Sequence, residues 1–208
     1  MKTDFIYRQF AWFYDLTFKH LLKGGHVETG RELEAGRCLR VAELGVGPGH
    51  SLPYYPDGTE LYGIDVSAEM IEMARKRAGK FPNLKPCLEV MDAMNTSFPD
   101  DFFDVVISFS VITVVDRPES LLKEALRICK PGGKIFIIGR MKREGLLDTI
   151  NQKLTSRLTM LLFGYRTTLD QKVYDSIAGD VKILERRRVN RIGPVSLSDM
   201  MILQKNEA

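Results

Sequence analysis

Three glycines that alternate along the chain, placed between two acidic residues, form the segment with the clearest potential for chemistry. An apolar run that contains one acid, Glu43, leads directly into Gly45, Gly47 and Gly49. This pattern predicts a buried parallel strand and then a tight loop in which the backbone bends sharply and lies close to a ligand. Asp65 comes twenty residues after Gly45, at the end of a second apolar run, where an acid can accept hydrogen bonds from ribose hydroxyls. The segment therefore predicts a nucleoside-bearing cofactor.

The spacing of the glycines separates the possible cofactors. A nicotinamide or flavin loop needs G-x-G-x-x-G, and the third place of that pattern is His50 in this chain. A phosphate-binding P-loop would end in Gly-Lys-Ser/Thr, and this segment has no lysine. The G-x-G-x-G pattern after Glu-Leu instead resembles the cofactor loop of the class I S-adenosylmethionine-dependent methyltransferases, whose cofactor carries no phosphate.

Three further segments resemble this family in the same order. Asp92 ends a third apolar segment, where the family places an acid that holds the adenine amino group. Residues 103–108 resemble the strand beside the methyl-transfer centre, and residues 126–137 contain the R-x-x-K-P-G-G pattern before a fifth strand. The matched elements span about 39–140 and imply S-adenosylmethionine as the cofactor. The cofactor-binding residues that we expect are Tyr7, Glu43, Gly45, Gly47, Gly49, Asp65, Val66, Met70, Asp92, Ala93 and Ser108. Met70 could cover the adenine or pack in the core.

Strands that alternate with helices predict an α/β fold with a doubly wound, mostly parallel sheet. We expect helices on both faces, and the family resemblance implies a seven-stranded, Rossmann-like sheet with an antiparallel last strand. Ligands of such sheets bind beyond the carboxyl ends of the strands, where Glu43, Gly45, Asp65, Asp92 and Ser108 are expected. The expected strands are 38–44, 60–65, 86–91, 103–109, 134–139, 181–189 and 195–203, with helices over 67–80, 116–130 and 142–163 and an N-terminal aromatic helix that Gly24 and Gly25 end.

The 208 residues suit a single domain with a sizeable core. Within it we expect an N-terminal lid or interfacial helix (1–30), a cofactor-binding core (38–140) and a basic helix with terminal strands (141–208). The longest charge-free apolar run, Val105–Val115, is too short to span a bilayer, and the N-terminus lacks the features of a signal peptide. We expect a cytoplasmic protein whose three cysteines, Cys38, Cys87 and Cys129, are reduced core residues.

The three histidines, His20, His26 and His50, have no metal-ligand spacing and are expected at the surface or in loops, so we predict no metal site.

The positive charge is concentrated in the last third of the chain. Between Arg140 and Arg191 there are twelve Lys and Arg residues against six Asp and Glu, so this segment has a charge of +6. Because the net charge of the whole chain is +3, the other residues together have a charge of −3. A basic segment of this kind favours an anionic membrane surface, a nucleic acid or an acidic substrate as a partner, although the charges could also simply solvate exposed faces. The chain has no appended RNA-binding module and no Asn/Asp-Pro-Pro-Tyr/Phe motif, so we expect no nucleic acid partner. Of the anionic partners, we expect a membrane surface, to which the protein binds peripherally. We also expect a monomer.

The N-terminal segment from Tyr7 to Asp15 resembles the Y-x-x-x-A-x-x-Y-D element that many small-molecule and lipid methyltransferases use as a lid. Tyr14 is our candidate for the residue that orients the acceptor amine or accepts its proton. Aromatic faces such as that of Trp12 could stabilise the developing ammonium. The alternative is an amphipathic helix that only packs on the domain.

A finer resemblance is to the soluble, Rhodobacter-type phosphatidylethanolamine N-methyltransferases. It is carried by residues 43–56, which end in Ser-Leu-Pro-Tyr-Tyr-Pro, and by residues 114–118, 163–167 and 185–190. It implies methylation of phosphatidylethanolamine, with Arg140, Arg186 and Arg188 available for the lipid phosphate. At most two of Arg186–Arg188 can share a strand face. The chain departs from the family at Gly139-Arg140-Met141, over the expected acceptor position, so a quinone or another small molecule is the alternative acceptor. A non-catalytic lipid-surface protein is a further alternative.

Overall fold

The computed structural model describes residues 23–34, 39–141, 168–169, 172–192 and 195–207. Several expectations lie outside these residues: the lid segment with Tyr7, Trp12 and Tyr14, the 142–163 helix, His20 and Cys38.

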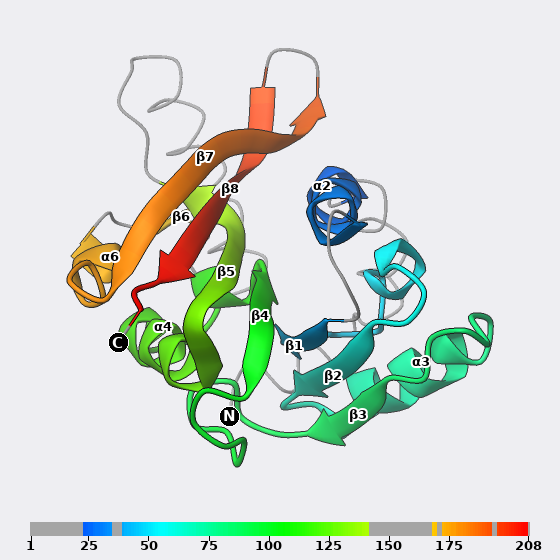
Figure 1. Cartoon of the computed structure of the whole chain (residues 1–208). Helices are drawn as coiled ribbons and strands as arrows, with labels where there is room; N and C mark the ends of the chain where they lie inside the picture. The colour runs from blue at the N-terminus through cyan, green and yellow to red at the C-terminus, as the bar shows by residue number, and fades with distance from the viewer. Residues whose placement is uncertain (1–22, 35–38, 142–167, 170–171, 193–194, 208) are drawn as a thin grey trace.

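One twisted sheet forms the centre of the molecule (Figure 1). Its strand order is β3-β2-β1-β4-β5-β8-β7, and the pairs among β1 to β5 are parallel. The last strand, β8, is antiparallel to both of its neighbours, which confirms the predicted mixed sheet. The bounds are β1 Arg40–Leu44, β2 Glu60–Asp65, β3 Cys87–Val90, β4 Phe103–Phe109, β5 Cys129–Met141, β7 Val181–Ile192 and β8 Val195–Lys205, with the short β6 Thr168–Leu169 paired to the end of β5.

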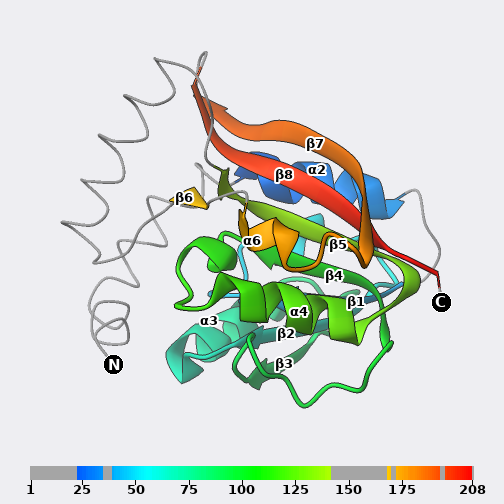
Figure 2. The same ribbon diagram turned by 90° about the vertical axis from the view of Figure 1, so that its left-hand side faces the viewer.

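Helices cover both faces of the sheet, as expected (Figure 2). Helices α2 (Lys23–Glu34) and α3 (Ala68–Ala78) lie on one face, and α4 (Pro118–Ile128) and α6 (Lys172–Asp175) lie on the other. Short 3-10 turns follow β1 (η1, Leu52–Tyr54) and β4 (η2, Val111–Thr113). Each face buries its own cluster of apolar side chains, so the sheet is held between two cores.

The helix after β2 begins where the sequence predicts. The Met70 N–H donates to the Ser67 side chain at 3.3 Å, so Ser67 is the N-cap. Met70, Ile71 and Ala74 are buried, as their spacing indicates. The cap therefore fixes the start of α3 directly after Asp65.

Gly24 and Gly25 lie inside α2 and do not end a helix, so this prediction is wrong. The Gly25 N–H donates to Asn190 Oδ1 at 2.8 Å, and a Cβ on Gly24 would lie 2.9 Å from the Asn190 backbone nitrogen. A Cβ on Gly30, one and a half turns later, would overlap the Tyr54 carbonyl oxygen. These glycines let the helix approach β7 and η1 closely, which outweighs their poor helix propensity.

The Pro-Gly-Gly segment is part of β5, although the fifth strand was expected to begin after it, at residue 134. The register passes from Phe103↔Cys129 to Val105↔Lys134, so extra residues of β5 form a bulge against β4. Gly132 has a φ of +72°, which suits glycine at this kink.

Two expectations about cysteine and histidine are corrected. Cys129 is buried, but Cys87 is exposed, because it lies on the edge strand β3, where only Leu88 is buried. His26 is 6% exposed and is not a surface residue. His50 lies in the loop after the glycines, as expected, and contacts Arg77.

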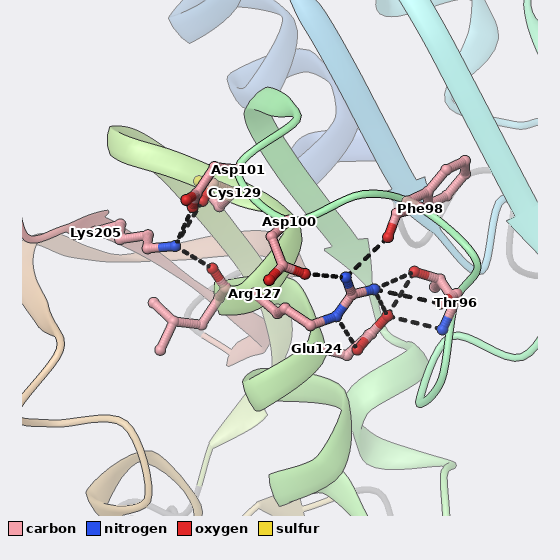
Figure 3. A network of polar contacts seen from close by, with 9 residues as sticks. Thr96, Phe98, Asp100, Asp101, Glu124, Arg127, Cys129 and Lys205 are labelled. Atoms are coloured by element: carbon pink, nitrogen blue, oxygen red, sulfur yellow. Dashed lines mark hydrogen bonds and ion pairs between the residues drawn. The ribbon is translucent and has the colours of Figure 1, made fainter.

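The arginine of the R-x-x-K-P-G-G pattern has a structural role (Figure 3). Arg127 donates to Glu124, to Asp100 at 2.5 Å and to the Phe98 carbonyl at 2.8 Å, so it ties the loop before β4 to the end of α4. Hydrogen bonding to Glu124 raises the pKa of Arg127. The lysine of the pattern, Lys130, pairs with Asp104 at 2.5 Å. The arginine and the lysine of this pattern thus stabilise the fold, away from the glycine loop.

Candidate active site

The three glycines after β1 all have positive φ angles, of +80°, +53° and +78° in order. The N–H groups of Gly45 and Val46 both donate to the Ile64 carbonyl at 2.8 Å, which ties the loop to β2. A side chain on Gly45 would overlap Val111, and a Cβ on Gly49 would lie 2.8 Å from Leu52 Cδ1. A Cβ on Gly47, in contrast, would meet nothing within 4 Å. The outer glycines allow the chain to pack, and the middle one leaves an open backbone surface.

Glu43 lies under this loop and is 1% exposed. Its Oε2 accepts hydrogen bonds from the Ser51 hydroxyl at 2.7 Å and the Tyr55 hydroxyl at 2.8 Å. Burial raises the pKa of Glu43 to about 7, against the two hydrogen bonds, and the nearby Asp65 adds to the rise. The carboxyl group therefore links the end of β1 to the segment that follows the glycines.

Asp65 closes the loop from the β2 side. Its Oδ2 accepts the Gly47 N–H at 3.0 Å, and its Oδ1 accepts the Ser67 N–H at 2.9 Å. Burial raises the pKa of Asp65 in spite of these bonds. Each carboxylate oxygen can accept a further hydrogen bond, so the group retains capacity for a ligand hydroxyl.

Apolar surface lies next to Asp65. Val66 is 69% exposed, the largest value among the exposed large hydrophobic residues described. Met70 is only 4% exposed, so it packs in the interior, as one of its two interpretations requires. Ala93 is also buried, and the neighbouring Asp92 is exposed and accepts the Met94 N–H at 2.8 Å. The exposed Val66 side chain therefore offers an apolar surface directly after Asp65.

Ser108, the second-last residue of β4, is fully buried. Its hydroxyl oxygen has no hydrogen-bond partner among the described residues. Since buried polar groups are normally paired, this atom is a candidate for a partner supplied by a ligand.

The sheet brings most of the predicted cofactor residues together at the carboxyl ends of its parallel strands, which we call the carboxyl edge. Glu43 lies beside Gly63 of β2 and Ile107 of β4, and Asp65 lies beside Val90 of β3. All the parallel strands end at this edge, which is the reason for the agreement with the prediction.

The predicted substrate arginines lie elsewhere. Arg187 pairs with Glu28 and Glu32 of α2, so Arg186 and Arg188 point to the opposite face of β7 and are exposed. Strands β4, β5 and β8 separate β7 from β1. Arg140 lies near the end of β5, beside Thr168. The structure therefore does not bring Arg186 and Arg188 to the glycine loop.

Sequence reasoning missed three residues near the site: Ser51, Tyr55 and His26. The Ser-Leu-Pro-Tyr-Tyr-Pro segment was noted only as a resemblance, and no spacing predicts that its hydroxyls bond a carboxyl eight and twelve residues earlier. His26 comes from a helix that precedes the sheet, and only the structure places its ring against Phe109.

These features fit an adenosine-bearing cofactor. The backbone surface at Gly47 is open, Asp65 can accept a ribose hydroxyl, Val66 offers an apolar face, and the Ser108 hydroxyl is unpaired among the described residues. Neither a lysine nor an arginine lies in the loop itself, which suits a cofactor without phosphate.

Comparison with known proteins agrees with this geometry. A family model described as a methyltransferase domain matches residues 42–137. Phosphatidylethanolamine N-methyltransferase from Cereibacter sphaeroides is 35% identical over 148 residues, which cover 69% of this chain and 72% of that protein. Phosphoethanolamine N-methyltransferase 1 from Zea mays is 30% identical over 141 residues, which cover 62% of this chain but 28% of that protein.

Among solved structures, magnesium protoporphyrin IX methyltransferase from Synechocystis PCC 6803, with bound S-adenosylhomocysteine, superposes with a TM-score of 0.71 at 16% identity. The match covers 92% of this chain and 85% of the other, and it shows the shared fold. The chain belongs to the class I S-adenosylmethionine-dependent methyltransferases. S-adenosylmethionine is therefore its methyl donor.

Proposed function

We propose that this enzyme methylates the amine of phosphatidylethanolamine and of its partly methylated forms, towards phosphatidylcholine. The observation that carries the proposal is the 35% identity to a phosphatidylethanolamine N-methyltransferase, which extends over 69% of the chain. The buried hydrogen bonds from Ser51 and Tyr55 to Glu43 also support the proposal. Both residues belong to the Ser-Leu-Pro-Tyr-Tyr-Pro segment, which resembles the lipid enzymes, and their bonds to Glu43 help to shape the donor site.

The donor would lie over the glycine loop. When bound, S-adenosylmethionine would supply a methyl group on a positively charged sulfur. An amine nitrogen would attack the methyl carbon in line as the carbon–sulfur bond breaks. In this proposal Asp65 accepts the ribose hydroxyls, Val66 contacts the adenine, and Asp92 accepts its amino group. Gly47 leaves the room that the donor needs, and the Ser108 hydroxyl gains a partner from bound ligand. The protein contributes mainly alignment and the exclusion of water.

The acceptor would enter from the side of the N-terminal segment. Tyr14 remains our proposed residue for orienting the amine, and Tyr7 and Trp12 remain proposed contacts of the donor and the acceptor. Arg140 lies on β5, which neighbours β4, whereas Arg186 and Arg188 lie on β7, two strands further from the donor loop. It is therefore a better candidate for the lipid phosphate than Arg186 or Arg188.

We also propose that the protein works at a membrane surface without crossing the bilayer. Of the helices that the structure describes, none has the length and apolar character of a membrane span. The +6 charge between Arg140 and Arg191 supports attraction to anionic lipids, at roughly 1 kcal/mol for each basic residue that reaches the surface.

The experiment is a comparison of acceptors with one labelled methyl donor. The acceptors are phosphatidylethanolamine vesicles with and without anionic lipid, soluble phosphoethanolamine, and a soluble quinol. We expect methylated phosphatidylethanolamine, formed at a higher rate on vesicles that contain anionic lipid. This increase in rate should become smaller as the salt concentration rises, because salt screens the attraction. If methyl groups are transferred only to the quinol or only to phosphoethanolamine, phosphatidylethanolamine is not the acceptor and the proposal is wrong.

A further inference from the structure

His26 is buried at the carboxyl edge of the sheet, beside the donor loop. Its ring packs edge-on against Phe109, the last residue of β4, with ring centroids 4.3 Å apart, and it stacks on Tyr54 of η1 at 5.8 Å. Phe109 follows Ser108, and η1 begins three residues after Gly49, the third glycine of the loop. His26 thus lies where the glycine loop and the end of β4 meet.

Two buried nitrogen atoms near the start of α2 have no hydrogen-bond partner among the described residues: His26 Nδ1, and Nδ2 of Asn190, which contacts the neighbouring Gly25. Both side chains are 6% exposed. The Gly25 N–H donates to Asn190 Oδ1 at 2.8 Å, which fixes the orientation of the amide and leaves its NH2 group as the unpaired end. An unpaired buried polar atom costs roughly 1–3 kcal/mol, so each of these two atoms is a candidate for a partner supplied by a ligand.

The charge state of His26 limits what that ligand is. Burial, with a smaller contribution from the nearby His50, lowers its pKa to about 3, so the imidazole is neutral at physiological pH. A neutral ring does not repel the positively charged sulfur of the donor. It is too weak a base to remove a proton from an ammonium group, but its Nδ1–H tautomer can donate a hydrogen bond. The Asn190 amide end can only donate. Two neutral donors match an oxygen acceptor.

We propose that His26 and Asn190 bind the phosphate oxygens of the acceptor headgroup, and so hold its amine beside the donor. This inference rests on the proposed function, since it assumes a phosphate-bearing acceptor. Strand β7 and helix α2 then supply the acceptor site, through Asn190 and His26, while β1 to β4 supply the donor site. Asn190 has a φ of +54°, in the left-handed region, which asparagine adopts more readily than most residues other than glycine. The backbone at this position therefore suits an asparagine.

Steady-state kinetics of three variants on phosphatidylethanolamine vesicles test the proposal. His26→Phe keeps a ring against Phe109 but has no nitrogen, and His26→Asn puts an amide nitrogen near the place of Nδ1. Asn190→Asp keeps the acceptor for the Gly25 N–H and replaces the donor with an oxygen. We expect KM for the lipid to rise at least about 10-fold in His26→Phe and Asn190→Asp, with smaller change in kcat, and His26→Asn to recover part of the loss. The dissociation constant of S-adenosylhomocysteine, measured by calorimetry, should stay within about threefold of the wild type and also reports that each variant is folded.

The outcomes separate the two proposals. If the wild-type protein methylates phosphatidylethanolamine and the KM of both His26→Phe and Asn190→Asp stays within about twofold, His26 and Asn190 do not bind the headgroup and the inference is wrong. If a variant loses S-adenosylhomocysteine binding but still unfolds cooperatively in urea, its residue belongs to the donor site, which would also contradict the inference. If the wild-type protein transfers no methyl group to this lipid, the proposed function fails and the inference fails with it.

Discussion

At the scale of single residues, the glycine loop shows that identical residues in one motif are needed for different reasons. Gly45 has no space for a side chain because Val111 lies against it, and Gly49 is similarly close to Leu52. A Cβ on Gly47 would meet nothing within 4 Å, so beyond its positive φ angle this glycine is needed, in our account, because the donor occupies that space. The sequence pattern predicted the loop and its acids, but it could not separate these roles, since they depend on neighbours from η2 and η1.

A matched pair of alanine variants tests the role of Gly47. Gly47 and Gly58 both have positive φ angles and nothing within 4 Å of an added Cβ, so Gly47→Ala and Gly58→Ala should each cost about 1–2 kcal/mol of stability. Only Gly47→Ala should weaken S-adenosylhomocysteine binding, by at least about 10-fold in calorimetry, because its methyl group enters the donor site. Equal affinities in the two variants would place the donor elsewhere.

Glu43 should give the protein a distinctive dependence of stability on pH. Its folded-state pKa of about 7 lies above the ordinary value of 4.5, so the folded protein binds more protons than the unfolded chain between these values. The contribution of Glu43 to stability is therefore present below about pH 4.5 and is lost as the pH rises to about 7. In Glu43→Gln this dependence is absent, so the difference in free energy of unfolding between the two proteins should change by roughly 3 kcal/mol over that window.

Urea unfolding of both proteins at several pH values measures this difference. A difference that stays constant from pH 4.5 to pH 7 would mean that the Glu43 pKa is not raised in the folded protein.

At the scale of elements, the parts predicted well are those whose signals are local. Strand β4 has the predicted bounds of 103–109, and α3 starts at its predicted cap, because apolar runs and caps act over a few residues. The role of Gly25 was predicted wrongly because its partner, Asn190, is 165 residues away. For the same reason the burial of His26 was missed. Neither a propensity nor a short motif encodes the approach of α2 to β7.

Helix α2 therefore offers a test in which two effects on stability oppose each other. Alanine favours a helix over glycine by about 1 kcal/mol, but at Gly24 its Cβ would lie 2.9 Å from the Asn190 backbone nitrogen. We expect the contact to dominate and Gly24→Ala to lower the free energy of unfolding by about 1–3 kcal/mol, measured in urea. Gly179→Ala, where nothing lies within 4 Å, is the control and should be close to neutral. A Gly24→Ala variant more stable than the wild type would show that α2 does not need this close contact.

At the scale of the whole molecule, two parts of the chain with different charge share one sheet. The basic part, from Arg140 to Arg191, supplies most of β7, and β8 joins that strand to β5 of the cofactor-binding core. This continuity supports our proposal that the chain is one domain. In our proposals, the parallel strands of this sheet hold the donor, and α2 with β7 holds the acceptor.

The most direct test of this account is mass spectrometry of phosphatidylethanolamine vesicles after incubation with the protein and S-adenosylmethionine. The account predicts lipid species heavier by one or more methyl groups with the wild-type protein and with Gly58→Ala, and a much smaller yield with Gly47→Ala. If the wild-type protein binds S-adenosylhomocysteine but leaves the lipid unmethylated, the donor site stands and phosphatidylethanolamine is not the acceptor.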